Sequence, residues 1–264
     1  MSDLRVCVLA GETLAAWQRA TLERALDETD ATVTCVLVDE SPGRTTGAAL
    51  RRALELREWS AVAAALAAER RLRGPIPEEE TVPLDHVPAL AGATRLPAVP
   101  KIVDGWKREL SAGVVEAAAE RADVAVLFGF GFVVGAVLDA FDHGVLSFHH
   151  GDLREYRGQP MGFWEFVEGE STAGVTLQRI DDTLDGGEVV ATREVEIGDA
   201  ARWRGVRSRL LAASEPMLAT GLRRVRDPSF APTRPDELGD LYTIPRGWPV
   251  VRFVGRTLAR SLAP

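Results

Sequence analysis

The sequence predicts an α/β protein with an open, mostly parallel, twisted sheet, helices on both faces, and a short basic C-terminal extension. Two observations carry this prediction. Short apolar segments with strand character alternate with longer segments of helical periodicity through the first 200 residues. The strand segments are almost continuously apolar, which is typical of parallel strands that are covered on both faces.

The first third of the chain follows this alternation. Residues 4–9 are a short apolar run, and GET at 11–13 leads into an amphipathic helix that we expect to end near residue 26. A second strand is predicted at 32–38. The next stretch, SPGRTTG, consists of turn-forming residues, and residues 48–73 then have a helical pattern that ends at a Gly-Pro pair.

The middle of the chain contains a loop and then a second series of strands and helices. PIPEEETVPLDHVP (75–88) is proline-rich and acidic, which indicates an irregular loop around one short strand. SAGVVEAAAERA predicts a helix, and Val124–Phe130 predicts an apolar strand. VVGAVLDAF (133–141) predicts another helix, and Val145–Phe148 the next strand.

Composition limits the class of protein. The chain has 264 residues, of which 46% are hydrophobic, enough for a substantial core. No apolar run approaches the roughly 18–20 residues of a membrane span, and the N-terminus does not resemble a signal peptide. The two cysteines do not make a disulfide framework, so we expect a cytoplasmic protein.

Charge divides the chain unevenly. Its net charge is −8, yet residues 201–264 contain twelve arginines and five acidic residues. We therefore expect one domain over residues 1–226 and a basic extension with a helix over 227–264. Such an extension suits contact with a phosphate, a nucleic acid or an acidic membrane surface.

Two histidines stand side by side in VLSFHHGDLREYRG (145–158). Alternate residues of a strand face the same way, so Ser147 and His149 share one face while His150 points to the other. The two rings therefore diverge, and the usual spacings of metal ligands are missing. We predict no metal site here, and one working histidine beside a neighbour of unknown use.

The strand ends are the expected ligand site. No G-x-G-x-x-G motif follows the first strand, no Walker A motif occurs, and FGFGF (128–132) lacks the third glycine of a dinucleotide motif. Ligands of open α/β sheets bind beyond the carboxyl ends of the strands. We predict a crevice lined by 128–132, 147–149 and 181–187.

The segment after the histidines completes a recognisable pattern. AGVTLQRI (173–180) alternates as a strand and runs into the acidic loop DDTLDGGEVV. Together SFHHG, DLREYRG and GVTLQRIDDTLDGG resemble the motifs of the folate-dependent formyltransferases, and QPMGFWEFVEGES is similar to the helix that follows their loop. The resemblance implies a Rossmann-type, formyltransferase-like sheet.

The resemblance also implies a reaction. Members of that family transfer a formyl group from 10-formyltetrahydrofolate to an amine, here expected to belong to a small molecule such as a nucleotide-linked aminosugar. By match, His149 and Asp185 take the catalytic positions, and Ser147 stands where the family has an asparagine that stabilises the oxyanion. The same match assigns Leu127, Gly129 and Asp182 to the folate.

Further positions and alternatives remain open from the residues alone. Arg154, Tyr156 and Arg157 follow the strand; they are either surface residues or a site for the phosphate or carboxylate of the acceptor. Because Ser147 replaces asparagine, a formyltetrahydrofolate hydrolase, an altered transferase or an inactive folate- or ligand-binding protein are alternatives. Transfer RNA is not an expected acceptor, since too few residues follow for the barrel that methionyl-tRNA formyltransferases carry.

The C-terminal helix is predicted from a repeat. Val251, Val254, Leu258 and Leu262 recur at helical spacing, with arginines on another stripe. We expect this helix to dock on its own domain or on a second copy in a homodimer. A helix resting on an anionic membrane is the alternative.

Overall fold

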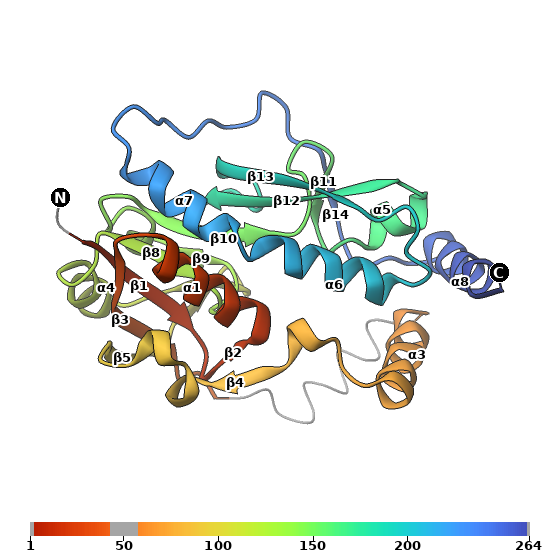
Figure 1. Cartoon of the computed structure of the whole chain (residues 1–264), viewed down its shortest axis with the longest axis horizontal. Coiled ribbons are helices and arrows are strands. Elements are labelled where there is room, and N and C mark those ends of the chain that lie inside the picture. The colour runs from red at the N-terminus through yellow and green to blue at the C-terminus, as the bar shows by residue number, and fades with distance from the viewer. Residues whose placement is uncertain (1–2, 43–57, 263–264) are drawn as a thin grey trace.

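The computed structural model describes residues 3–42 and 58–262, and its centre is one seven-stranded sheet (Figure 1). Its strands, in spatial order, are β13 (Glu188–Glu196), β12 (Thr172–Arg179), β10 (Val145–His149), β8 (Val124–Leu127), β1 (Leu4–Ala10), β3 (Ala31–Asp39) and β5 (Thr94–Ala98). From β10 to β5 the neighbours are parallel, whereas β12 pairs antiparallel with both β10 and β13. The predicted open and mostly parallel sheet is confirmed.

Helices cover both faces of this sheet. α1 (Ala16–Glu28), α6 (Trp203–Ser214) and α7 (Met217–Arg226) lie over one face, and α4 (Ala112–Ala119) lies over the other (Figure 1). Successive residues of β1 show why both faces need cover: Val6 and Val8 enter the first core, while Cys7 and Leu9 enter the second. The continuous apolar character of the strand follows from this double burial.

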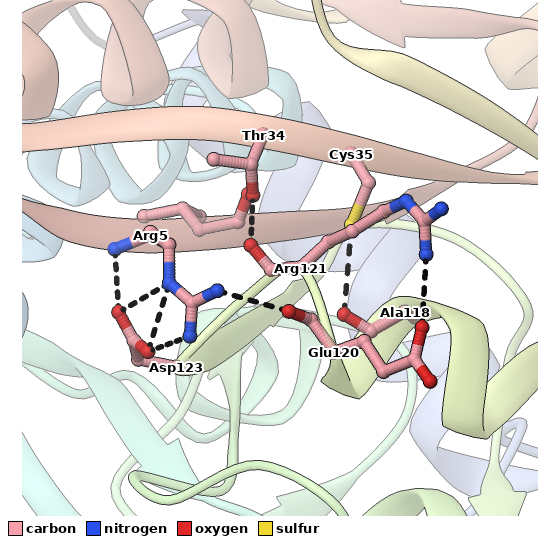
Figure 2. A network of polar contacts seen from close by, with 8 residues as sticks. Arg5, Thr34, Cys35, Ala118, Glu120, Arg121 and Asp123 are labelled. Atoms are coloured by element: carbon pink, nitrogen blue, oxygen red, sulfur yellow. Dashed lines mark hydrogen bonds and ion pairs between the residues drawn. The ribbon is translucent and has the colours of Figure 1, made fainter.

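A polar network fixes the amino ends of the strands (Figure 2). The Arg5 N–H donates to Asp123 Oδ2 at 2.8 Å, and the Arg5 guanidinium forms an ion pair with the same carboxylate at 2.5 Å. Thr34 Oγ donates to the carbonyl of Arg121 at 2.7 Å, which ties β3 to the turn before β8. These contacts hold the strand order at the edge opposite the carboxyl ends.

Small sheets and single turns occupy the connections. β2 (Thr13–Ala15) pairs with β4 (Thr81–Pro83); β6 (Lys101–Val103), β7 (Lys107–Glu109) and β9 (Val133–Val134) form a second sheet; β11 (Tyr156–Gly158) pairs with β14 (Asp240–Tyr242). Single 3-10 turns lie at Pro77–Glu79, Leu84–His86, Pro88–Leu90 and Ala136–Leu138. Residues 75–88 are therefore the expected irregular loop around one short strand.

Three expectations about local structure meet different outcomes. α3 (Glu58–Arg73) confirms the later part of the helix predicted at 48–73, whereas its first part and most of SPGRTTG lie outside the described residues. The helix predicted at 133–141 is wrong, because Gly135 adopts φ +81° and separates β9 from a single 3-10 turn. The strand predicted at 124–130 stops at Leu127, and Phe130 beyond it has φ +66°.

The C-terminal helix docks on α5 (Phe163–Glu168) through a phenylalanine and two arginines. α8 (Trp248–Leu262) buries Phe253, whose ring centroid lies 5.2 Å from that of Phe163. Two arginines of α8, at positions 256 and 260, lie over the Phe166 ring, each 5.6 Å from its centroid. The expectation that this helix docks on its own domain is confirmed, and the docking face is not the valine and leucine stripe. That stripe is exposed, at 56% for Val251, 48% for Val254 and 59% for Leu258.

No helix within residues 3–42 and 58–262 is both long and apolar enough to cross a membrane. The segment after α7 contributes β14 and α8, and both pack on the rest of the chain: β14 lies beside β11, and α8 lies against α5 and α3. The core containing Val6 thereby extends to Phe253, far along the sequence.

Candidate active site

The carboxyl end of β10 brings His149 and Asp185 together. His149 Nδ1 lies 3.3 Å from Asp185 Oδ1, and the two side chains are 8% and 20% exposed. The other ring nitrogen, Nε2, lies 2.9 Å from the carbonyl oxygen of Tyr156. The histidine and the aspartate that the resemblance assigns to catalysis therefore lie within hydrogen-bonding reach of each other.

This environment favours a charged imidazole. Burial alone would lower the pKa of His149, but hydrogen bonding and charge attraction to Asp185, helped by the Tyr156 carbonyl, raise it above its usual value. Burial would likewise raise the pKa of Asp185, yet the bond to His149 holds it below its usual value. Since both ring nitrogens face acceptors, His149 is best satisfied with a proton on each.

Backbone geometry presents the aspartate. Asp185 adopts φ +45°, a left-handed conformation that aspartate tolerates better than most residues. The N–H of Gly158, at the end of β11, donates to Asp185 Oδ2 at 3.0 Å. The two glycines after Asp185 are buried, and an added Cβ on Gly187 would lie 2.3 Å from the carbonyl oxygen of Arg179. The LDGG sequence is thus what allows the loop to turn so tightly against β12.

The positions that the resemblance assigns to oxyanion and folate lie along the same edge. Ser147 is opposite Leu127 on β8, two residues before His149 and on the same face of the sheet. Gly129 follows β8 where its backbone meets Gly11, since a Cβ there would lie 2.9 Å from the Gly11 nitrogen. Asp182, by contrast, is exposed on the acidic loop.

The three candidates for the acceptor already have partners in the chain. Arg154 pairs with Asp152 at 2.6 Å in an exposed position, and the Tyr156 hydroxyl donates to Glu168 at 2.7 Å. Arg157 donates to the carbonyl of Gly239 at 2.7 Å and to that of Leu184 at 3.3 Å. Arg157 therefore braces the loop that carries Asp185.

His150 faces the other side of the sheet, as predicted. Its Nε2 lies 3.0 Å from Ser214 Oγ on α6, and its ring meets the edge of Trp17 with centroids 5.1 Å apart. Burial, with repulsion from His149, lowers the pKa of His150 to about 3. His150 is consequently a neutral packing residue, and the two rings cannot share a metal ion.

Two buried polar residues near the site were not identified from the sequence. Glu165 on α5 is 2% exposed, burial raises its pKa to about 7, and its Oε1 has no hydrogen-bond partner among residues 3–42 and 58–262. Gln178 on β12 is 3% exposed and pairs in register with Ser147. The sequence did hold signals for both: a carboxylate inside the apolar run FWEFVE, and an amide in a strand next to the family's catalytic position.

Comparison with known proteins shows which protein family has a domain similar to the one that carries this site. Residues 105–220 match the formyl transferase family model. Residues 105–220 thus form a formyl transferase domain. The resemblance to the folate-dependent formyltransferases is confirmed, and the domain contains β8, β10, β12 and the His149–Asp185 pair.

Individual relatives agree with this assignment. A methionyl-tRNA formyltransferase of Anaeromyxobacter dehalogenans is 34% identical over 124 residues, which cover 46% of this chain and 40% of the relative. Two crystal structures share the fold. Phosphoribosylglycinamide formyltransferase from Anaplasma phagocytophilum has a TM-score of 0.55 and 16% identity, covering 84% of this chain and 87% of that one. The N-formyltransferase from Helicobacter canadensis, in complex with folinic acid and dTDP-3-aminofucose, has a TM-score of 0.54 and 14% identity, covering 90% and 70%.

The match to the methionyl-tRNA formyltransferase spans two fifths of that relative, 40% of its length. The formyl transferase domain and the fold are therefore common to this chain and its relatives, whereas the acceptor differs among them. The names of these relatives include a tRNA, a ribonucleotide and a nucleotide-linked sugar.

Proposed function

We propose that this protein transfers a formyl group from 10-formyltetrahydrofolate to an amine of a small molecule, such as a nucleotide-linked aminosugar. The carrying observation is the His149–Asp185 pair, 3.3 Å apart at the carboxyl end of β10 within the formyl transferase domain. A buried imidazole that is held charged by a carboxylate suits a reaction in which negative charge develops on a carbonyl oxygen.

The proposed mechanism follows from the protonation of this pair. An uncharged amine attacks the formyl carbon, which gives an oxyanion and a positively charged nitrogen. The His149 Nε2–H, which is bonded to the Tyr156 carbonyl in this structure, must exchange that carbonyl for the oxyanion, which it protonates; the neutral ring then takes a proton from the attacking nitrogen. As the tetrahedral centre collapses, the imidazolium protonates the departing folate nitrogen, the C–N bond to the folate breaks, and the hydroxyl proton returns to the ring. The net proton transfer is from the amine to the folate nitrogen. Asp185 keeps the ring oriented and charged at the start of each cycle.

The positions of the expected binding residues support separate regions for the folate and for the acceptor. Leu127 ends β8 beside Ser147 and Gly129 follows the strand; we place the folate there, with Asp182 at its solvent side. The acceptor would enter near the loop of Arg154, Tyr156 and Arg157, whose internal bonds then give it a fixed shape. We place the catalytic unit in residues 1–226, a boundary supported by the end of α7 at Arg226.

A donor-release assay tests the proposal. The purified chain is mixed with 10-formyltetrahydrofolate and a panel of amines, including nucleotide-linked aminosugars, a ribonucleotide amine and methionyl-tRNA, and released tetrahydrofolate is measured. Release that depends on a small amine, and that His149→Ala and Asp185→Asn abolish, supports the proposal. Release only with methionyl-tRNA would show that the acceptor is a tRNA and not a small molecule.

The remaining outcomes contradict the proposal in different ways. Equal release with and without any amine identifies a hydrolase, which the serine at position 147 makes the specific competitor. Binding of reduced folate without any release identifies a ligand-binding protein. If the protein neither binds reduced folate nor releases tetrahydrofolate, a folate-dependent activity is excluded.

A further inference from the structure

Gln178 stands directly across from Ser147 in the sheet. β10 and β12 are antiparallel, and their register pairs Ser147 with Gln178 and His149 with Thr176. Residues paired in this way project from the same face, with Cβ atoms about 4.5–5.5 Å apart. The glutamine therefore lies beside the serine, on the face that carries His149, at the carboxyl end of β10.

The side chain of Gln178 is buried and oriented. It is 3% exposed, and its Oε1 accepts a hydrogen bond from the N–H of Gly187 at 3.1 Å. Because a backbone N–H can only donate, the oxygen of the carboxamide must face Gly187 and the nitrogen must face away. Gly187 belongs to the loop that presents Asp185, so the amide is tied to the same structure as the catalytic pair.

The amide nitrogen has no acceptor in the part of the chain that the structure describes. No hydrogen bond joins Gln178 Nε2 to residues 3–42 or 58–262, although the Oε1 of the same group is satisfied. An amide N–H that has no partner in the chain, on the face that carries His149, can donate to a ligand on which negative charge develops.

We propose that Gln178 donates this hydrogen bond to the oxyanion of the transferring formyl group, in place of the carboxamide that Ser147 lacks. The proposal rests on the function proposed above, since it assigns a residue to that reaction. An amide carried by β12 replaces one carried by β10, and cross-strand register keeps it on the working face. The Ser147 hydroxyl, with a single donor on a short side chain, then plays the lesser part.

The competing explanation is structural: Gln178 would only accept the Gly187 N–H and so hold the acidic loop. Two substitutions separate these roles. Gln178→Glu keeps a carboxylate oxygen for Gly187 and removes the donor nitrogen, while Gln178→Met removes both groups at similar volume. Arg193→Met, at an exposed position of β13, is the matched control.

Steady-state kinetics give the first readout. If Gln178 donates to the oxyanion, both Gln178→Glu and Gln178→Met lower kcat by about 10²–10³-fold. KM for the folate and the melting-temperature shift caused by reduced folate stay close to wild type. Arg193→Met leaves all of these values unchanged.

Rescue gives the second readout, which a structural role would not produce. Ser147→Asn added to Gln178→Met places a carboxamide back on β10, and we expect it to recover at least about tenfold in kcat, one good hydrogen bond. A Gln178→Glu or Gln178→Met variant with wild-type kcat overturns the inference. So does a double variant without recovery, or loss of folate binding in Gln178→Met that Gln178→Glu restores together with kcat.

The proposed function can fail separately. If the wild-type protein releases formyl groups to an amine while Gln178→Met does so equally well, only the assignment of Gln178 falls. If the wild-type protein neither binds reduced folate nor transfers its formyl group, the proposed function falls and the inference falls with it.

Discussion

Replacing Asp185 by asparagine tests the electrostatic core of the site. The carboxylate is what keeps His149 charged, because burial alone would lower the pKa of this histidine. At the observed separation of 3.3 Å, two unit charges attract by about 5 kcal/mol with an effective dielectric constant near 20. Desolvation offsets part of this, and removal of one partner from a buried pair costs roughly 3–5 kcal/mol.

The pH dependence of that cost has a definite sign. The raised pKa of His149 contributes stability that is present below its unfolded value, about 6.5, and is lost as the pH rises through the folded value. The lowered pKa of Asp185 contributes stability that is present above its unfolded value, about 3.9, and is lost as the pH falls through the folded value. Asp185→Asn should therefore lose most stability between about pH 4 and pH 6.5.

Denaturant unfolding at pH 5.5 and at pH 9 measures the difference between wild type and Asp185→Asn. We expect a loss of about 3 kcal/mol at the lower pH and a smaller loss at the higher one. NMR titration of the imidazole protons should show the pKa of His149 falling in the variant. An equal loss at both pH values, or an unchanged His149 titration, would refute the assignment of a charged pair.

Three other predictions follow from single features of the structure. Reduced folate should raise the melting temperature of wild type and of His149→Ala alike, while turnover of the variant is lost; scanning calorimetry with a release assay decides this. Gly129→Ala should lower the free energy of unfolding by about 1–3 kcal/mol, because its Cβ meets backbone at 2.9 Å; Gly113→Ala, which meets nothing within 4 Å on α4, should not destabilise. If the exposed stripe of α8 holds a homodimer, Val254→Glu should turn a dimer into a monomer in light scattering; a wild-type monomer at every concentration would refute this.

The sheet could be predicted because its signal is local. The parallel strands β1 and β3 are apolar runs in the sequence, and the antiparallel β12 alternates; all three begin and end within two residues of their predicted positions. The error at 133–141 arose where helical spacing continued across Gly135, whose left-handed backbone the spacing does not reveal. A single dihedral angle there outweighs the periodicity of nine residues.

The orientation of α8 was not predictable from its own sequence. Helical spacing identified two stripes on α8, but which stripe docks depends on the partner surface. That surface is aromatic, so Phe253 and the guanidinium groups of Arg256 and Arg260 pack on it better than valine does. The partner residues lie about ninety positions earlier in the chain, where no local pattern connects them to the tail.

The candidate site shows the same division between local and long-range information. Strand alternation was enough to separate His149 from His150, because direction along one strand is a local property. The motif identified Asp185 as a site residue but did not identify Gln178. That residue matters only through its register with Ser147, and the register of β12 against β10 is set by tertiary pairing rather than by spacing. The effect of the serine at position 147 therefore depends on the residue opposite it. The sequence shows that Ser147 lacks the amide donor of the family's asparagine, and the folded sheet places the amide of Gln178 next to it.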